Sequence, residues 1–281
     1  MQRKVNRFAL LLVCFLMAFA ASACSQNTAP ATADSNEVAE VAFDLSAYEN
    51  SDFLITPQDL QGLLGSEDLV LLDCNKPDIY ADEHIPGAIG IGLHAFSDKV
   101  GKPGDPGWGT IKKKEDLIPV LESLGIDNEK TVVFYSDVFR GPGADGRAVW
   151  QLKLAGMDNV KILVGGLSYW KELGYDVTKD ESAAPIPTTG VELKDYDQSY
   201  MATKDSIFEN LGDQVVIDVR TEGEFKGSQK AGEPRGGHIA GAEYMLWTSL
   251  LNENGTPKNP EEIKTMMAAL NVTPETDFTV Y

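Results

Sequence analysis

The chain has 281 residues, with 43 acidic against 24 basic side chains and a formal net charge of −19. That length allows one large domain or two ordinary ones, and a hydrophobic content of 43% excludes a chain that is disordered throughout. The acidic excess argues against sequence-independent binding of nucleic acid, because such a protein repels phosphate. Only three Cys are present, two of them within the first 24 residues, and this excludes a disulfide scaffold.

Residues 1–23 have the pattern of a signal peptide, with basic side chains followed by an apolar run that is too short to span a membrane. The junction Ala21-Ser22-Ala23-Cys24 resembles a bacterial lipobox, although Ala21 stands where Leu is usual. We therefore expect Cys24 to be lipidated and the protein to be anchored on the periplasmic side of the cell envelope, at the outer membrane. Ordinary secretion or a soluble periplasmic protein is the alternative. Residues 24–43 predict a flexible tether.

Two parts of the chain resemble each other in the order of their motifs. Residues 69–91 read LVLLDCNKPDIYADEHIPGAIGI, and residues 215–245 contain VVIDVR followed by GGHIAGAEYM. This is the pattern of an internal repeat. We expect two domains, at residues 44–177 and 196–281, and a linker at residues 178–195, whose prolines and polar composition suit a connection.

Each part alternates predicted strands with predicted helices. Short apolar runs predict buried parallel strands, and periodic apolar positions predict helices. The strands are expected at 69–73, 131–135, 160–163, 215–218 and 278–281, and the longer helices at 115–124, 143–155 and 261–270. The expected fold class is α/β, with an open, mostly parallel sheet and helices on both faces in each domain, and with ligands beyond the carboxyl ends of the strands.

These motifs carry a resemblance to a known family. The chain resembles a tandem-domain rhodanese-like sulfurtransferase of the thiosulfate or 3-mercaptopyruvate type. The resemblance rests on Asp218-Val219-Arg220 with Gly237-His238-Ile239-Ala240-Gly241-Ala242, and on His84-Ile85-Pro86-Gly87-Ala88 with the stretch 165–170. It covers residues 41–281 and implies two rhodanese-like domains.

The resemblance implies a double displacement. A cysteine takes a sulfane sulfur from a small anionic donor, thiosulfate or 3-mercaptopyruvate, and passes it to a thiol or cyanide acceptor. In that family the cysteine follows the strand that corresponds to residues 278–281, at position 282, so no catalytic residue is expected within the chain as given. The second domain is then expected to be incomplete and loosely folded, and the first to be noncatalytic, because Ser136 takes the cysteine position.

The ending itself leads to a further expectation. We expect an in-frame UGA, read as selenocysteine, at position 282, followed by about 40 residues or more, as the first copy continues from Tyr135 to Tyr175. A frameshift, a contig edge or a nonsense allele is the alternative.

The candidate site residues are few. Arg220 follows a predicted strand, where a cation meets the donor anion, with a structural salt bridge as the alternative. Arg235 is a weaker substrate-binding candidate, with Lys230, because solvated loop charges explain both. In the first copy Asn75 replaces the arginine. No metal and no cofactor are expected, because the sequence has three His and no paired Cys ligands.

Several other residues have a structural interpretation beside a functional one. His84 and His238 are expected to make structural hydrogen bonds rather than to catalyse. Cys74 is expected to be a small buried hydrophobe. Trp108 and Trp247 line a cleft or, by default, pack in a core or at its rim. The stretch 101–104 predicts a turn.

Three functions remain open on the sequence. The first is an exported sulfurtransferase that works through a persulfide-type intermediate on a Cys or selenocysteine at position 282. The second is a noncatalytic rhodanese-like module that binds an anion or a partner. The third is an inactive truncated product. The expected partners are the small anionic donor, the acceptor and, through a lipid anchor, the membrane; no nucleic acid is expected.

Overall fold

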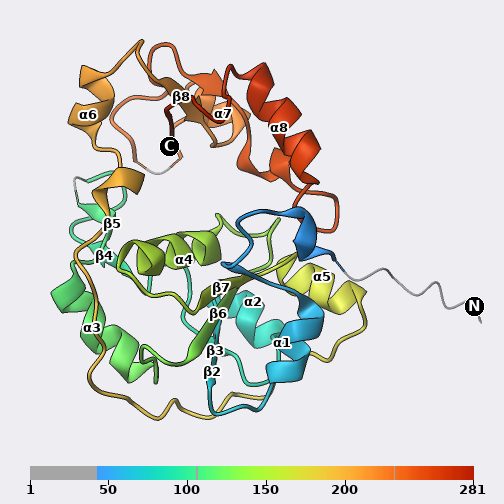
Figure 1. Ribbon diagram of the computed structural model, residues 1–281. Coiled ribbons are helices and arrows are strands. Elements are labelled where there is room, and N and C mark those ends of the chain that lie inside the picture. Colours follow the sequence, from blue (N-terminus) through green and yellow to red (C-terminus); the bar gives the residue numbers. More distant parts are fainter. Residues whose placement is uncertain (1–42, 106, 231) are drawn as a thin grey trace, which may run out of the picture. The chain divides into compact units, whose positions relative to one another are not determined.

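The computed structural model describes residues 43–105, 107–230 and 232–281, all within the compact unit Glu40–Tyr281 (Figure 1). The predicted signal peptide, Cys24 and residues 24–42 of the predicted tether lie outside the described residues. Within the described ranges, no helix combines the length and the apolar character that crossing a membrane requires.

A five-stranded parallel sheet organises the first part of the chain. Its order is β1 (Leu54–Ile55), β7 (Val160–Leu163), β6 (Thr131–Tyr135), β2 (Leu69–Asp73) and β3 (Ile89–Gly90). The two longest strands end in register, with Asp73 beside Tyr135. The apolar runs form central strands because both faces of the sheet are covered.

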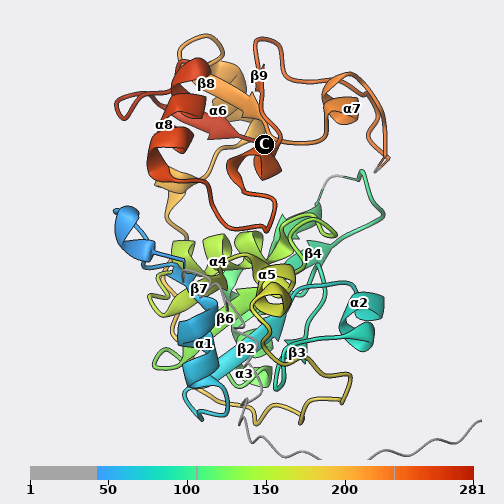
Figure 2. The ribbon, with the colours of Figure 1, turned by 90° about the vertical axis from the view of Figure 1, so that its right-hand side faces the viewer.

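The two faces of this sheet carry separate cores. Successive strand residues point to opposite faces, so Leu72 and Phe134 pack in one core, while Leu71 and Val133 pack in the other. The first core includes residues of α3 (Lys114–Ser123) and α4 (Ala144–Leu154), and the second includes residues of α1 (Pro57–Leu63) and α5 (Gly166–Glu172). Figure 2 shows these helices around the sheet, together with the short α2 (Pro77–Asp82). The predicted α/β class, with helices on both faces, is confirmed.

Two short strands, which the sequence analysis did not predict, follow β3. β4 (Ser97–Lys99) and β5 (Trp108–Ile111) pair in antiparallel fashion. The expected turn at 101–104 lies between them, and its Gly101 and Gly104 have positive φ angles of 82° and 90°, which glycine adopts without steric cost.

The residues predicted as a linker, 178–195, run without helix or regular strand but are attached to the first part of the chain. The backbone N–H of Thr188 donates to the Glu122 carbonyl oxygen (2.9 Å), and the Glu122 carboxylate accepts from the N–H of Gly190 (2.7 Å). Val191 is buried in the first core. Polar composition therefore did not reveal the fixed course of this stretch, and its role as a linker between two domains stays a prediction.

A smaller parallel sheet lies in the last part of the chain. β8 (Val215–Asp218) is central, between β10 (Phe278–Val280) and β9 (Glu243–Tyr244). The buried core cluster here consists of Ile217, Met245 and Val272, far fewer residues than in either core of the first part. The helices are α6 (Lys204–Glu209), α7 (Glu222–Phe225) and α8 (Pro260–Ala269). Single-turn 3₁₀ segments are η1 (Leu45–Ala47), η2 (Gln198–Tyr200) and η3 (Trp247–Leu250).

Candidate functional site

Arg220 lies just beyond the carboxyl end of β8, held by the aspartate that ends the strand. Its Nε and Nη2 donate to the two carboxylate oxygens of Asp218, at 3.0 and 2.6 Å, and Nη2 also donates to the Gly237 carbonyl oxygen at 2.9 Å. The Asp218 side chain is fully buried, whereas that of Arg220 is 29% exposed. A guanidinium has five N–H donors, so both donors of Nη1 remain without a partner within the described residues.

Tyr281 follows β10 and joins three elements at this edge. Its hydroxyl accepts a hydrogen bond from the N–H of Ile239 (2.8 Å), in the turn after His238. Its carbonyl oxygen accepts from the N–H of Val219 (3.1 Å), and its ring centroid lies 5.1 Å from the Arg220 guanidinium carbon. The carboxyl ends of β8 and β10 are thereby fixed beside Arg220.

The two turn histidines, His238 and His84, each pack on a neighbouring aromatic ring. The His238 ring stacks on Phe225, with the ring centroids 3.8 Å apart, and its Nδ1 lies 2.8 Å from the Phe225 carbonyl oxygen. His84 repeats this arrangement on Tyr80, at 3.9 Å and 2.8 Å. Both histidines therefore make the structural hydrogen bonds that the sequence predicts.

The first part of the chain contains the same strand-end unit. Asp73 ends β2 as Asp218 ends β8, and each accepts through Oδ1 from the backbone N–H two residues later, at 2.7 and 3.0 Å. The hydroxyl of Tyr135 accepts from the N–H of Ile85 (3.0 Å), and its carbonyl oxygen accepts from the N–H of Cys74 (2.8 Å). These are the counterparts of the Tyr281 contacts with Ile239 and Val219.

The two units differ at the second residue after the aspartate. Asn75 is 2% exposed and uses its side-chain oxygen to accept from the N–H of Asp137 (2.7 Å), within the loop after β6. Ser136 is buried at the position after Tyr135 and lies against Asp145, a buried carboxyl in the first turn of α4. An amide, a hydroxyl and a carboxyl thus occupy the region where the second unit has a guanidinium.

The electrostatics of the two units are opposed. Burial alone would raise the pKa of Asp218, but the hydrogen bonds from Arg220 outweigh it, so that this pKa is lowered. At Asp73 burial dominates over the hydrogen bonds from Asn75, and the pKa is raised. Burial also raises the pKa of Asp145, although Ser136 favours the ionised form. The second edge therefore holds a carboxylate paired with a partly free cation, whereas at the first edge burial favours the neutral form of Asp73 and Asp145.

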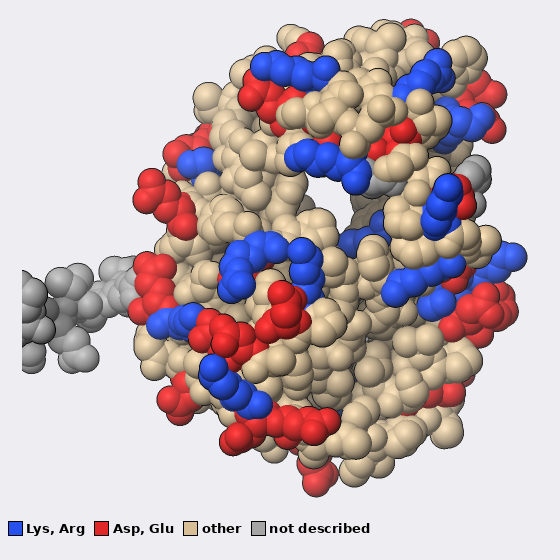
Figure 3. All heavy atoms as spheres, turned by 180° about the vertical axis from the view of Figure 1, so that it is seen from behind, with Lys and Arg blue, Asp and Glu red and all other residues tan. Residues whose placement is uncertain are grey.

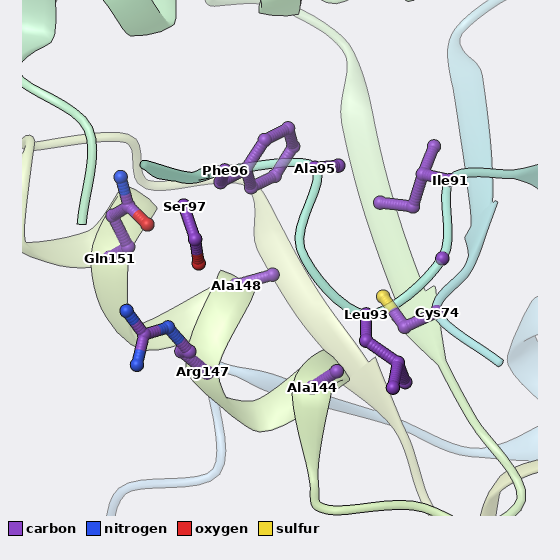
Figure 4. Close-up of a pocket in the computed structure, with 11 residues that line it drawn as sticks. Cys74, Ile91, Leu93, Ala95, Phe96, Ser97, Ala144, Arg147, Ala148 and Gln151 are labelled. Atoms are coloured by element: carbon purple, nitrogen blue, oxygen red, sulfur yellow. The ribbon is translucent and has the colours of Figure 1, made fainter. Parts of the chain in front are cut away.

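Cys74, the free cysteine that the structure describes, is 1% exposed and belongs to the first core. Figure 4 shows it at a cavity of about 10 Å³, room for about one water, that Ala144, Arg147 and Ala148 also line. Burial, then Asp145 and Asp73, raise the pKa of this thiol well above its usual range. Such a thiol is a poor nucleophile, which agrees with its expected role as a buried hydrophobe.

The remaining candidates lie on loops, on β5 and on η3, where the Trp247 backbone N–H donates to the Val219 carbonyl oxygen (3.1 Å) at this edge. Arg235 and Lys230 are exposed in the loop after α7 and make no ion pair with a residue that the structure describes. Trp108 is half-buried beside His94, with an edge-on ring contact. Trp247 is half-buried in η3. Within residues 43–105, 107–230 and 232–281, no group of three or more His, Cys, Asp or Glu residues is arranged to hold a metal ion.

Three residues of this arrangement were not predicted from the sequence to belong to the site. Tyr135 and Tyr281 were assigned only to strands, although a Tyr at the end of both predicted strands was a signal for a shared role. Asp145 gave no signal, because its proximity to Ser136 arises only when α4 packs on the sheet.

A parallel sheet with helices on both faces and hydrogen-bonded polar residues at its carboxyl edge defines the class of open α/β proteins, in which ligands are expected beyond the carboxyl ends of the strands. A family model described as "Rhodanese-like domain" matches residues 56–173 of the chain. The chain is also 30% identical over 241 residues to a thiosulfate sulfurtransferase of Azotobacter vinelandii, covering 83% of each protein. The chain therefore belongs to the rhodanese family.

Solved structures share the fold. The 3-mercaptopyruvate sulfotransferase SseA of Escherichia coli is similar with a TM-score of 0.63 and 21% identity, over 81% of this chain and 87% of that one. The anaerobic ergothioneine biosynthesis enzyme of Chlorobium limicola is similar with a TM-score of 0.67 and 22% identity, over 83% of this chain. The chain spans 61% of the length of that enzyme. At these identities the likeness concerns the fold.

Proposed function

We propose that the protein is an exported sulfurtransferase that moves a sulfane sulfur from an anionic donor, thiosulfate or 3-mercaptopyruvate, to a thiol or cyanide. The nucleophile is a Cys or selenocysteine at position 282, directly after Tyr281. The observation that carries the proposal is the partly free guanidinium of Arg220 beside Tyr281, in a chain of the rhodanese family.

The proposed reaction has two displacements. With thiosulfate, the thiolate or selenolate at position 282 attacks the outer sulfur, the S–S bond breaks, and sulfite leaves with the electron pair. With 3-mercaptopyruvate, the C–S bond breaks and the carbon takes up a proton to give pyruvate. The acceptor thiolate or cyanide then attacks the outer sulfur and releases the enzyme nucleophile.

Arg220 would receive the donor anion through Nη1, since Nε and Nη2 are engaged with Asp218 and Gly237. The Asp218 carboxylate fixes the guanidinium in position, and Tyr281 fixes the end of β10 beside it. We expect Arg220→Ala to raise the KM for the donor by roughly tenfold or more, the cost of a charge-assisted hydrogen bond.

The first rhodanese-like domain, residues 44–177, is proposed to be noncatalytic. Ser136 stands at the nucleophile position, and a hydroxyl cannot carry a persulfide. Asn75 stands at the position of Arg220, and Asp145 is buried beside Ser136. Neither Asn75 nor Ser136 supplies a cation that could receive an anionic donor.

Activity assays test the proposal directly. The chain that ends at Tyr281 should form thiocyanate from thiosulfate and cyanide only at background rate. The same chain continued past Tyr281 by the residues of its own gene should turn over, and serine at position 282 should abolish this. Turnover by the shorter chain that Cys74→Ser removes would overturn both the position of the nucleophile and the inert role of Cys74.

The gene decides between the two nucleophiles. A UGA after codon 281, followed by an open frame that encodes a loop, a helix and a strand, supports selenocysteine. A cysteine codon supports the thiol. UAA, UAG or the absence of such a frame would contradict the proposed continuation.

We also propose attachment of Cys24 to lipid on the periplasmic side of the envelope, with residues 24–43 as a tether. Labelling with a palmitate analogue should mark the mature protein and move it to the membrane fraction. A Cys24→Ala variant is the control. An unlabelled, fully soluble mature protein would instead indicate ordinary secretion.

A noncatalytic module that binds an anion or a partner is the second candidate. The observation that favours it is the extent to which Arg220 is already used, since three of its hydrogen bonds go to Asp218 and Gly237. This candidate predicts donor binding without turnover even when the chain continues past position 282. Turnover by the continued chain excludes it.

A further inference from the structure

A pocket of about 340 Å³ lies in the first part of the chain, beyond the carboxyl end of β2. This volume is at the lower end of the range for small-molecule sites, about 300–1,000 Å³. Three of its lining residues are basic: Lys76 at the start of α2, His94 in the loop after β3, and Lys99 at the end of β4. The rest of the lining is apolar or glycine and contains no carboxylate.

The ammonium groups of the two pocket lysines are not engaged in ion pairs within the described residues. Neither Lys76 nor Lys99 makes an ion pair with a residue that the structure describes, although 43 of 281 residues are acidic. Asp98, which directly precedes Lys99 in the sequence, is paired with Lys112 at 3.1 Å. Asp78, two residues after Lys76, belongs to α2 and does not line the pocket.

Two cations, Lys99 and Arg147, act on His94 in this region. Burial, followed by the charges of Lys99 and Arg147, lowers the pKa of His94. Arg147 reaches this region from α4, where its guanidinium donates to the Gly109 carbonyl oxygen. Figure 3 shows one face of the molecule, on which basic side chains are interspersed with acidic ones.

The pocket is separate from the cavity at Cys74, but the two share one wall. Residues 91–93 and Ala95 line both, so the segment after β3 separates the buried thiol from the basic pocket. All of the lining residues belong to the first part of the chain, whereas Arg220 follows β8 in the last part.

We propose that the pocket of Lys76, His94 and Lys99 is a second anion site, which binds a small doubly charged oxyanion such as thiosulfate, sulfate or phosphate. Two ammonium groups supply the donors and the positive charge that such an anion requires, and the lining contains no carboxylate that would compete for them. The inference does not depend on the proposed sulfur transfer, because its ligand class is inferred from the lining alone.

The test observes His94 directly. The chain has three His, so one His94→Gln variant identifies the imidazole resonances of His94, and the remaining ones belong to His84 and His238. Sodium thiosulfate and, separately, inorganic phosphate are titrated at constant pH and low ionic strength, with sodium chloride at matched ionic strength as the salt control. We expect a saturable shift of the His94 resonances with the oxyanions, and little change at His84 and His238.

Matched variants assign the effect to the lysines. Lys76→Gln and Lys99→Gln should each weaken binding about two- to fivefold, as expected for exposed charge pairs, and together more strongly. Lys179→Gln, an exposed lysine paired with Asp82 outside the pocket, should leave binding unchanged. Circular dichroism checks that all variants fold.

The outcomes are distinct. Saturation by both oxyanions indicates a general oxyanion site, and saturation by thiosulfate alone indicates a sulfur-selective one; both support the proposal. An equal shift with chloride, the absence of saturation, or equal binding by the double lysine variant would overturn it. Loss of sulfur transfer in the activity assay has no bearing on this result.

Discussion

The two parts of this chain use one strand-end unit under opposite electrostatic conditions. In both, an aspartate ends a strand, a tyrosine ends its neighbour, and a turn backbone N–H donates to the tyrosine hydroxyl. In the second part the side chain of Arg220 is paired with the aspartate, whereas in the first part the side chain at the same position, Asn75, accepts from the N–H of Asp137. The two units therefore share a backbone arrangement and differ in the side chain two positions after the aspartate.

The surroundings of the unit differ as well. β6 lies between β7 and β2, and Phe134 is fully buried. Its counterpart in β10, Val280, is 53% exposed, and β10 pairs with β8 alone among the strands that the structure describes. Equivalent positions should thus respond very differently to substitution.

The largest expected effect comes from this difference in burial. Phe134→Ala should lower the free energy of unfolding by about 3–5 kcal/mol, because it leaves a cavity between sheet and helices. Val280→Ala should cost less than about 0.5 kcal/mol, as for other exposed positions. Urea unfolding followed by circular dichroism measures both, and a large loss for Val280→Ala would indicate that this side chain is buried in the intact protein.

The next effect concerns the ion pair. Arg220→Asn gives the second unit the residue of the first and leaves the fully buried carboxylate of Asp218 unpaired, at a cost of about 3 kcal/mol. Adding Asp218→Asn should restore much of this loss at neutral pH, since no buried charge then remains. If the double variant were as unstable as Arg220→Asn, the cost would come from packing instead.

The tyrosine hydroxyls should have a smaller, graded effect. Tyr135→Phe removes the acceptor of the fully buried Ile85 N–H, and we expect a loss of about 1–3 kcal/mol. Tyr281→Phe should cost about 0.5 kcal/mol, because water can reach the half-buried Ile239. Equal losses in urea unfolding would contradict the difference in burial.

The smallest effect is a difference in pH response. The pKa of Asp218 is lowered on folding, so its stabilisation is present above the unfolded value of about 3.9 and is lost as the pH falls. The pKa of Asp73 and of Asp145 is raised, so their stabilisation is present below about 3.9 and is lost as the pH rises.

Acid should accordingly loosen the second unit first. Hydrogen exchange can follow the N–H of Val219, bonded to Tyr281, against the N–H of Cys74, bonded to Tyr135. Protection at Val219 should decrease on acidification while protection at Cys74 persists. In Arg220→Asn the pH dependence at Val219 should largely disappear, and identical profiles for both amides would contradict the opposed pKa shifts.

Much of the fold could be predicted from the sequence, because local patterns determine it. The apolar runs 69–73, 160–163 and 215–218 form the strands expected for them, since a short run buried on both sheet faces has few other uses. The HIPGA and HIAGA turns likewise indicated the repeated histidine contact. Of the β4–β5 hairpin, only the turn was predicted from the sequence, because the two short strands lack a periodic pattern of apolar residues.

Only the tertiary structure decided which partners the side chains at the strand ends contact. Sequence placed Arg220 at a strand end but left open whether it binds a donor or an aspartate, and its bond to Gly237 spans 17 positions. Asn75 meets Asp137 across 62 positions, and Val191 enters the core through a stretch that reads as a polar connection. Such contacts depend on which elements pack together, because each side chain alone is compatible with several partners, and long-range packing selects one of them.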